Sequence, residues 1–222
     1  MKKRKRKKKL KVDKVSIYIY AGIIVLVVLM VVLGIYSCSI NKNKVWGNTG
    51  VNVDASQPEI DVQLLDVNEY SRPGIKSDPI TGIVIHYTAN PGSSAQDNRD
   101  YFEGLKDSHA TSASSHFVVG IKGEIIQCVP TWELAYASNG RNHDTVSIET
   151  CHPDESGKFT DETYKSLVQL TAWLCKKFDL TAADVIRHYD ITGKICPKYF
   201  VEHEEAWKLF KGDVQAALGK ME

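Results

Sequence analysis

Three side chains in this 222-residue chain have the chemistry to bind one transition-metal ion. His188 and Cys196 lie eight residues apart in one polar segment, and His86 ends an apolar stretch far upstream. Imidazole nitrogen and thiolate sulfur are typical zinc ligands, and three protein ligands leave a fourth position for water, as in catalytic zinc sites. Spacing alone leaves a second interpretation open, in which each residue is an unrelated core or strand-end residue.

Short apolar segments that alternate with amphipathic segments are expected to position these residues. Strands are predicted at about 80–86, 117–121, 124–129, 144–150 and 184–188, and helices at about 93–106, 160–178 and 202–218. Ser94 with Asp97, and Thr160, have the types and spacing of helix N-caps. The alternation predicts an α/β fold, a single domain with a central mixed β-sheet flanked by helices.

Four motifs occur in order along this predicted domain. They are Ile83–Thr88, Ser115–Val119, Thr145–Cys151 and Arg187–Pro197. Together they resemble the zinc-dependent N-acetylmuramoyl-L-alanine amidases of the bacterial and phage lysin type, relatives of the peptidoglycan recognition proteins. The resemblance covers roughly residues 62–205. It implies a zinc (Zn2+) site at His86, His188 and Cys196, and cleavage of the amide bond between N-acetylmuramic acid and L-alanine in peptidoglycan.

Two further residues are candidates for catalysis. Glu149 lies near the end of an apolar strand pattern, where an inward-pointing carboxylate needs a reason, and the matching glutamate of the family is catalytic; a surface glutamate is the alternative. Lys194 lies two residues before Cys196 and has an ammonium group that can stabilise an oxyanion. The resemblance favours this role over that of a solvated loop lysine. We expect Glu149 to be the general base.

His116 and Tyr136 are candidate substrate-binding residues. His116 begins a predicted strand, so a hydrogen-bonded core histidine is an equal alternative. Similar proteins sometimes have a catalytic tyrosine just before this histidine, but this chain has Ser115, so the base is better sought elsewhere. Ala135–Ser138 stands where relatives usually have Trp-His-Ala-Gly, which leaves the detail of glycan or peptide recognition open.

The charge of the chain is strongly asymmetric. Residues 1–14 hold ten of the 28 basic residues and one acid, so the other 18 bases and 26 acids give residues 15–222 a net charge of −8. A basic block can be a nucleic-acid arm. Here it precedes an uncharged apolar run, Ile17–Tyr36, which as a helix would span a bilayer core of about 30 Å. We therefore expect no nucleic-acid partner.

The positive-inside rule then predicts the order of segments. These are a basic cytoplasmic tail at 1–16, a transmembrane signal anchor at 17–38, a polar linker at 39–61 and the zinc amidase domain at 62–222. A cleaved signal peptide is the alternative, but the apolar run is long for one and no Ala-x-Ala site follows. The expectation is a single-pass protein of the cell membrane, attached through this helix, with a cytoplasmic N-terminus and an extracytoplasmic catalytic domain, from a Gram-positive bacterium.

The predicted function is thus a membrane-anchored zinc hydrolase of peptidoglycan. A non-catalytic peptidoglycan-binding module is the alternative, although related recognition domains commonly lack the cysteine ligand that Cys196 would supply. Cys128 and Cys151 form either a disulfide or two buried free thiols. No pattern in the sequence indicates an oligomer, so a monomer is expected.

Overall fold

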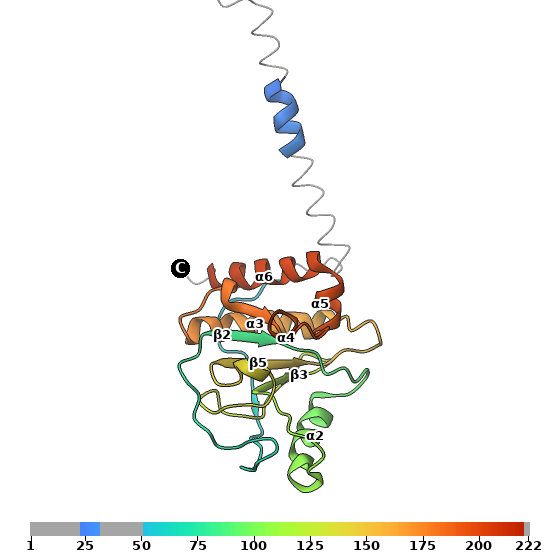
Figure 1. Ribbon diagram of the computed structural model, residues 1–222. Helices are drawn as coiled ribbons and strands as arrows, with labels where there is room; N and C mark the ends of the chain where they lie inside the picture. The colour runs from blue at the N-terminus through green and yellow to red at the C-terminus, as the bar shows by residue number, and fades with distance from the viewer. Residues whose placement is uncertain (1–22, 32–50, 220–222) are drawn as a thin grey trace, which may run out of the picture. The chain divides into compact units, whose positions relative to one another are not determined.

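The computed structural model describes residues 23–31 and 51–219 (Figure 1). They belong to two units, Met1–Asn48 and Thr49–Glu222. The described part of the first unit is a single helix over residues 23–31, with exposed apolar side chains. The second unit contains the sheet, the remaining helices and every predicted site residue.

The first unit corrects the prediction of a transmembrane helix. Among the residues that the structure describes, no helix combines the length and the apolar character needed to cross a membrane. The prediction of a span over 17–38 is therefore wrong, as are the membrane attachment and the single-pass localisation derived from it. The basic tail at 1–16 and the rest of the predicted span lie outside the described residues.

A six-stranded mixed sheet forms the centre of the second unit. Its strand order is β1-β4-β3-β5-β2-β6, with the bounds β1 Asp61–Val62, β2 Gly82–Ile85, β3 Phe117–Val119, β4 Ile125–Gln127, β5 Thr145–Thr150 and β6 Val185–Arg187. Four strands, β3, β5, β2 and β6, run parallel to one another. Strand β4 pairs with β3 in the antiparallel direction. The carboxyl ends of β5, β2 and β6 therefore meet at one edge of the sheet.

Helices cover both faces of this sheet (Figure 1). Helix α2 (Ala95–Ser108) lies on one face, and α3 (Asp161–Lys177) lies on the other with α6 (Glu204–Leu218) packed against it. The shorter elements are η1 (Asn139–Arg141), η2 (Ala182–Asp184), α4 (His188–Thr192) and α5 (Lys198–Glu202). Ser94 and Asp97 form the predicted reciprocal capping box of α2, and Thr160 caps α3 through its side chain. The predicted mixed α/β domain is confirmed.

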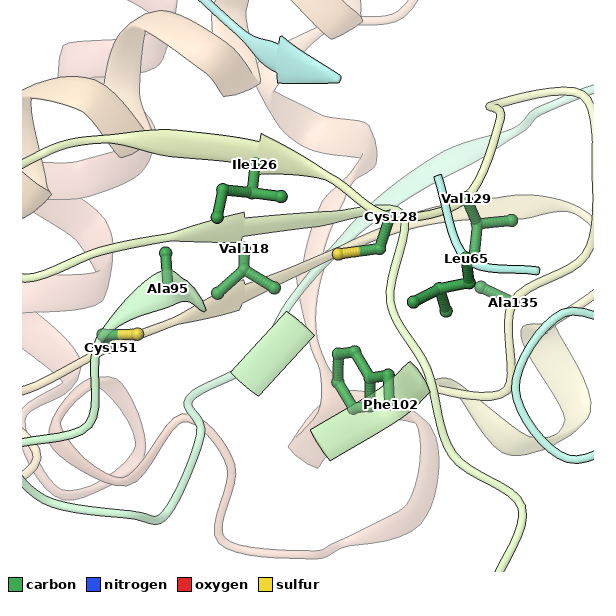
Figure 2. Packing of buried hydrophobic residues seen from close by; sticks show 9 residues of the cluster. All are labelled: Leu65, Ala95, Phe102, Val118, Ile126, Cys128, Val129, Ala135 and Cys151. Atoms are coloured by element: carbon green, nitrogen blue, oxygen red, sulfur yellow. The ribbon is translucent and has the colours of Figure 1, made fainter. Parts of the chain in front are cut away.

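The core beneath α2 is apolar and closely packed (Figure 2). Phe102 of α2 lies against Val118 of β3 and Ile126 of β4, and burying one such aromatic side chain contributes about 1.5–3 kcal/mol. Strand β5 runs through the middle of the sheet, which accounts for its nearly continuous burial. This core supports the sheet, and the candidate site is built on the ends of its strands.

The two cysteines whose state was open are free thiols in this core. Cys128 donates its backbone N–H to His116, and Cys151 donates to Val119, so they lie beside positions of β3 that are three residues apart. That separation is about 10 Å along a strand, well beyond the reach of a disulfide. Both cysteines are buried without a disulfide bond.

The chain packs onto this unit before the predicted domain start at residue 62. Val53 and Ala55 are buried, and Ser56 accepts a hydrogen bond from Gln169 of α3. The segment 51–61, the described part of the predicted linker, therefore lies against the domain.

Candidate metal centre and active site

The three candidate ligands meet at the carboxyl edge of the sheet. His86 directly follows β2 and His188 directly follows β6, and these strands are paired in parallel with Ile85 opposite Arg187. Cys196 reaches the same place from the loop between α4 and α5. One ligand atom from each of the three lies within 4.8 Å of the others, and Cys196 Sγ is 3.9 Å from His86 Nδ1. Strand pairing thus brings together residues that are far apart in the sequence.

The imidazole rings are held from behind, away from the shared space. His86 Nε2 lies 3.2 Å from Ser138 Oγ, and His188 Nε2 lies 2.8 Å from Asn139 Oδ1. Burial lowers the pKa of His188, and burial with the neighbouring His188 lowers that of His86 well below its ordinary value; Lys194 adds to both shifts. Both rings are therefore neutral at pH 7, the form in which histidine binds a metal.

The donor set fits a zinc ion. His188 Nδ1 is buried and has no hydrogen-bond partner among the described residues, a state that costs about 1–3 kcal/mol unless a ligand satisfies the atom. The 3.9 Å between Cys196 Sγ and His86 Nδ1 is close to the roughly 3.6 Å expected for a sulfur and a nitrogen bound to one tetrahedral zinc. Burial raises the pKa of the Cys196 thiol to about 12, with Glu149 adding to the shift, so a thiolate here needs a cation beside it.

Glu149 lies beside this cluster at the end of β5. Its Oε1 is 4.0 Å from His86 Nδ1 and its side chain is 18% exposed, while Oε2 is buried without a hydrogen-bond partner in the described part of the chain. Burial raises the pKa of Glu149 to about 8, an effect that the charge of Lys194 opposes. A carboxyl group that titrates near neutral pH can both accept and return a proton.

Lys194 lies on the exposed part of the loop before Cys196. Its ammonium group forms no hydrogen bond or ion pair with any residue that the structure describes, yet its charge lowers the pKa of Glu149 and of both histidines. A free cation that acts on all of these groups lies close enough to the cluster to interact with an anionic species formed there.

His116 and Tyr136 lie differently from the cluster residues. His116 is 1% exposed; its Nδ1 accepts from the Ser147 N–H at 3.0 Å and its Nε2 donates to the Glu133 carbonyl at 2.9 Å. Burial lowers its pKa to about 4. Tyr136 is half-buried, and its backbone exchanges hydrogen bonds with Ser114. The structure does not join either residue to the metal cluster, and their substrate-binding roles stay predictions.

Ser138 and Asn139 were not predicted from the sequence as partners of the two histidines. The only signal available was the Asn139-Gly140 pair, which is typical of a tight turn and says nothing about what the turn touches. Cavity size is no guide to the site either. A hollow of about 930 Å³ is lined in part by residues 76–80, just before β2, which places it at the opposite end of that strand from His86.

Fold and site together define a class of protein: a mixed α/β domain with two histidines and a cysteine clustered beside a buried carboxylate. A family model described as N-acetylmuramoyl-L-alanine amidase matches residues 76–199, a range that contains the cluster, Glu149 and Lys194. The chain belongs to the N-acetylmuramoyl-L-alanine amidase family.

Curated relatives agree with this assignment, and a solved structure shares the fold. The chain is 37% identical to the N-acetylmuramoyl-L-alanine amidase CwlL of Bacillus licheniformis over 169 residues, 70% of this chain and 46% of that protein. It is 33% identical to the amidase BlyA of Bacillus subtilis (strain 168) over 175 residues, 69% of this chain and 46% of that protein. The chain thus spans about half the length of these relatives. The catalytic domain of XlyA has the same fold, with a TM-score of 0.61, 24% identity, and coverage of 71% of this chain and 99% of that one.

Proposed function

We propose that this chain is a zinc-dependent hydrolase that cleaves the amide bond between N-acetylmuramic acid and L-alanine in peptidoglycan. Membership of the amidase family supports the reaction and the substrate. The observation that carries the proposal is the pair of unsatisfied buried atoms, His188 Nδ1 and Glu149 Oε2, at the edge of the sheet where Cys196 and His86 also meet. Unsatisfied groups of this kind are costly in a folded protein, and a metal ion with its bound water would satisfy both of these atoms.

His86, His188 and Cys196 would hold the zinc ion. When bound, zinc lowers the pKa of a coordinated water to about 7 and polarises the substrate carbonyl. The two histidines supply neutral nitrogen donors, because burial and neighbouring cations keep their pKa values low. Cys196 contributes a thiolate, whose charge a nearby cation compensates.

Glu149 moves the proton in this mechanism. Burial raises its pKa to about 8 even though the charge of Lys194 opposes the shift, and a further positive charge beside the carboxylate would lower that pKa. Glu149 then takes a proton from the attacking water and returns it to the departing L-alanine nitrogen. Lys194 places its ammonium group toward the oxyanion that forms on the carbonyl oxygen.

The decisive test measures bond cleavage in purified peptidoglycan by the full-length chain. New L-alanine amino termini are assayed beside new reducing sugar ends, with chelator, and again after zinc is restored. The proposal expects amino termini that disappear with chelator and return with zinc, and no reducing ends. The matched variant Glu149→Gln should bind wall without producing termini. Binding by the zinc-loaded native chain without new termini would favour the non-catalytic recognition module instead.

A further inference from the structure

Two consecutive residues hold the two candidate histidine ligands from behind. Ser138 Oγ lies 3.2 Å from His86 Nε2, and Asn139 Oδ1 lies 2.8 Å from His188 Nε2. Both residues belong to one turn, 137–142, between β4 and β5. The histidines themselves follow two other strands, so this turn is a single element that contacts both.

The Asn139 contact selects one protonation pattern at His188, and the Ser138 contact is compatible with the same pattern at His86. The amide oxygen of Asn139 has no hydrogen to donate, so His188 Nε2 must carry the proton and donate it. The proton-free nitrogen of neutral His188 is then Nδ1, the buried atom that has no partner among the described residues. Ser138 is 1% exposed, and its hydroxyl can accept from His86 Nε2 in the same way, which leaves His86 Nδ1 free toward Cys196.

Hydrogen bonds stabilise the conformation of the turn at 137–142. Asn142 accepts hydrogen bonds through Oδ1 from the backbone N–H groups of Ala137 and Ser138. Arg141 donates its backbone N–H to the Ser138 carbonyl at 3.0 Å, and Thr145 of β5 donates its hydroxyl to the Arg141 carbonyl. The contacts to the histidines therefore come from a braced segment that is tied to the central strand.

Asn139 also has the backbone conformation that its position requires. Its φ is +50°, in the left-handed region where asparagine is favoured over most other residues. In this conformation its side chain reaches the ring of His188, although the residue itself is exposed. Closing the turn alone would not require a hydrogen-bond acceptor beside His188 Nε2, which Asn139 Oδ1 provides.

We propose that Ser138 and Asn139 are positioning residues that fix the proton on Nε2 of both histidines and direct both Nδ1 atoms into the cluster. The inference rests on the proposed zinc site and deepens it, because it names the residues that prepare the site for the metal. Groups that hold metal-binding histidines in this way typically change metal affinity by 10- to 100-fold when they are removed. The turn orients the ligands before the metal arrives, so the effect belongs to binding and not only to catalysis.

The test compares four variants of the full-length chain. Asn139→Gly removes the acceptor and tolerates the positive φ, whereas Asn139→Asp keeps an acceptor oxygen at the same place. Ser138→Ala removes the hydroxyl. Gly140→Ala is the matched control in the same turn, since an added Cβ there meets no atom within 4 Å. Zinc affinity is measured by competition with a chromophoric chelator, and the proton position on His188 by long-range ¹H–¹⁵N NMR of the zinc-free protein.

Asn139→Gly should weaken zinc binding by about tenfold or more, and Ser138→Ala by about two- to tenfold. Asn139→Asp and Gly140→Ala should stay within about threefold of the native chain. NMR should find the His188 proton on Nε2 in the native chain and a mixture of tautomers in Asn139→Gly. Unchanged zinc affinity in Asn139→Gly, or a native His188 proton on Nδ1, would overturn the inference.

The two readouts separate this inference from the proposed function. A native chain that binds no zinc counts against the proposed function, and the proton position in the zinc-free protein still decides whether the turn controls His188. If the native chain binds zinc and all four variants bind it with the same affinity, the proposed function stands and the turn has no role in metal binding.

Discussion

Two of the three buried histidines His86, His116 and His188 differ from the third in their hydrogen bonds. His116 is 1% exposed and binds protein groups through both ring nitrogens. His188 is also buried, but only Nε2 is bonded and Nδ1 has no partner among the described residues. His86 likewise has a polar partner behind it and turns Nδ1 toward Cys196. Burial is common to all three residues, and the free nitrogen is what separates them.

The comparison shows how a functional site differs from the surrounding core. His116 uses both ring nitrogens for hydrogen bonds inside the protein, so the residue links the start of β3 to β5 and to the Glu133 segment. At the cluster, His188 Nδ1 and Glu149 Oε2 are left unsatisfied, each at a cost of about 1–3 kcal/mol. We infer that the cluster gives up stability for binding, and that a metal would restore it.

Removing the cysteine should produce the largest effect. Cys196→Ser replaces a thiolate by a hydroxyl that is a poor zinc ligand at neutral pH. Zinc affinity should therefore fall by more than about 100-fold, the largest loss typical of residues that only hydrogen-bond to a metal ligand. Amidase activity should drop to that of the metal-free protein. Metal content after dialysis measures this, as does the stabilisation by zinc, which for a bound ion is about 2.7 kcal/mol of unfolding free energy at a zinc concentration of 100 times Kd.

His116→Gln is the control that sharpens the contrast. It changes a histidine with the same burial but no free nitrogen, and it should retain stoichiometric zinc. If His116→Gln lost zinc as completely as Cys196→Ser, the division between structural and ligand histidines would be wrong.

Glu149→Gln should have the next largest effect. The amide cannot accept the proton of the attacking water, so kcat should fall by about 10²- to 10⁴-fold while zinc content stays at the native level. Steady-state assays on peptidoglycan with metal analysis of the same samples check this. Retained turnover would remove Glu149 from the proposed mechanism.

The same substitution should stabilise the metal-free protein. Burial raises the pKa of Glu149 to about 8, so above pH 4.5 the unfolded chain loses this proton more readily than the folded one, and folding stability falls as pH rises toward 8. Removing the charge should therefore add about 1–2 kcal/mol at pH 8, discounted for the partial exposure of the side chain. Urea unfolding at pH 8 and pH 5 measures the difference, which should be small at pH 5.

His116 should give a pH dependence of the opposite sign. Its pKa is lowered to about 4 by burial, so its contribution is complete above the unfolded value near 6.5 and is lost as pH falls toward 4. Between pH 7.5 and pH 5 the native chain should lose about 2 kcal/mol more stability than His116→Gln, both in chelator. His143→Gln, at a 55% exposed side chain, is the matched control and should follow the native curve.

Local signals predicted most of the elements that carry the site. The apolar patterns and caps identified β2, β5 and the three long helices α2, α3 and α6 within a few residues, because these signals depend on neighbours in the sequence. The five-residue helix α4, His188–Thr192, was not predicted, because a single turn has too little periodicity to detect; the extended segment predicted at 184–188 overlaps it only at His188. Apolar composition also suggested a membrane span at 17–38, but none of the helices that the structure describes is long and apolar enough to cross a membrane.

The site itself was predictable only as a set of residue types. Motif resemblance named His86, His188, Cys196 and Glu149, and strand pairing explains why the first two meet. The contacts from Ser138 and Asn139 and the closed hydrogen bonds of His116 depend on the packing of separate loops. No periodicity or spacing encodes them, so only the structure could show that both ring nitrogens of His116 are bonded within the protein.

The smallest expected effect comes from Lys194, which is exposed and therefore screened by water. Lys194→Met should lower kcat by about tenfold, less than the 10²- to 10³-fold typical of buried oxyanion donors. The charge of Lys194 lowers the pKa of Glu149, so its removal should raise that pKa and move the acidic limb of the pH–rate profile to higher pH. Lys208→Met, at an exposed lysine of α6, is the control and should leave both rate and profile unchanged. An unshifted profile with native kcat would mean that Lys194 is a solvated loop lysine, and that catalysis is confined to the buried side of the cluster.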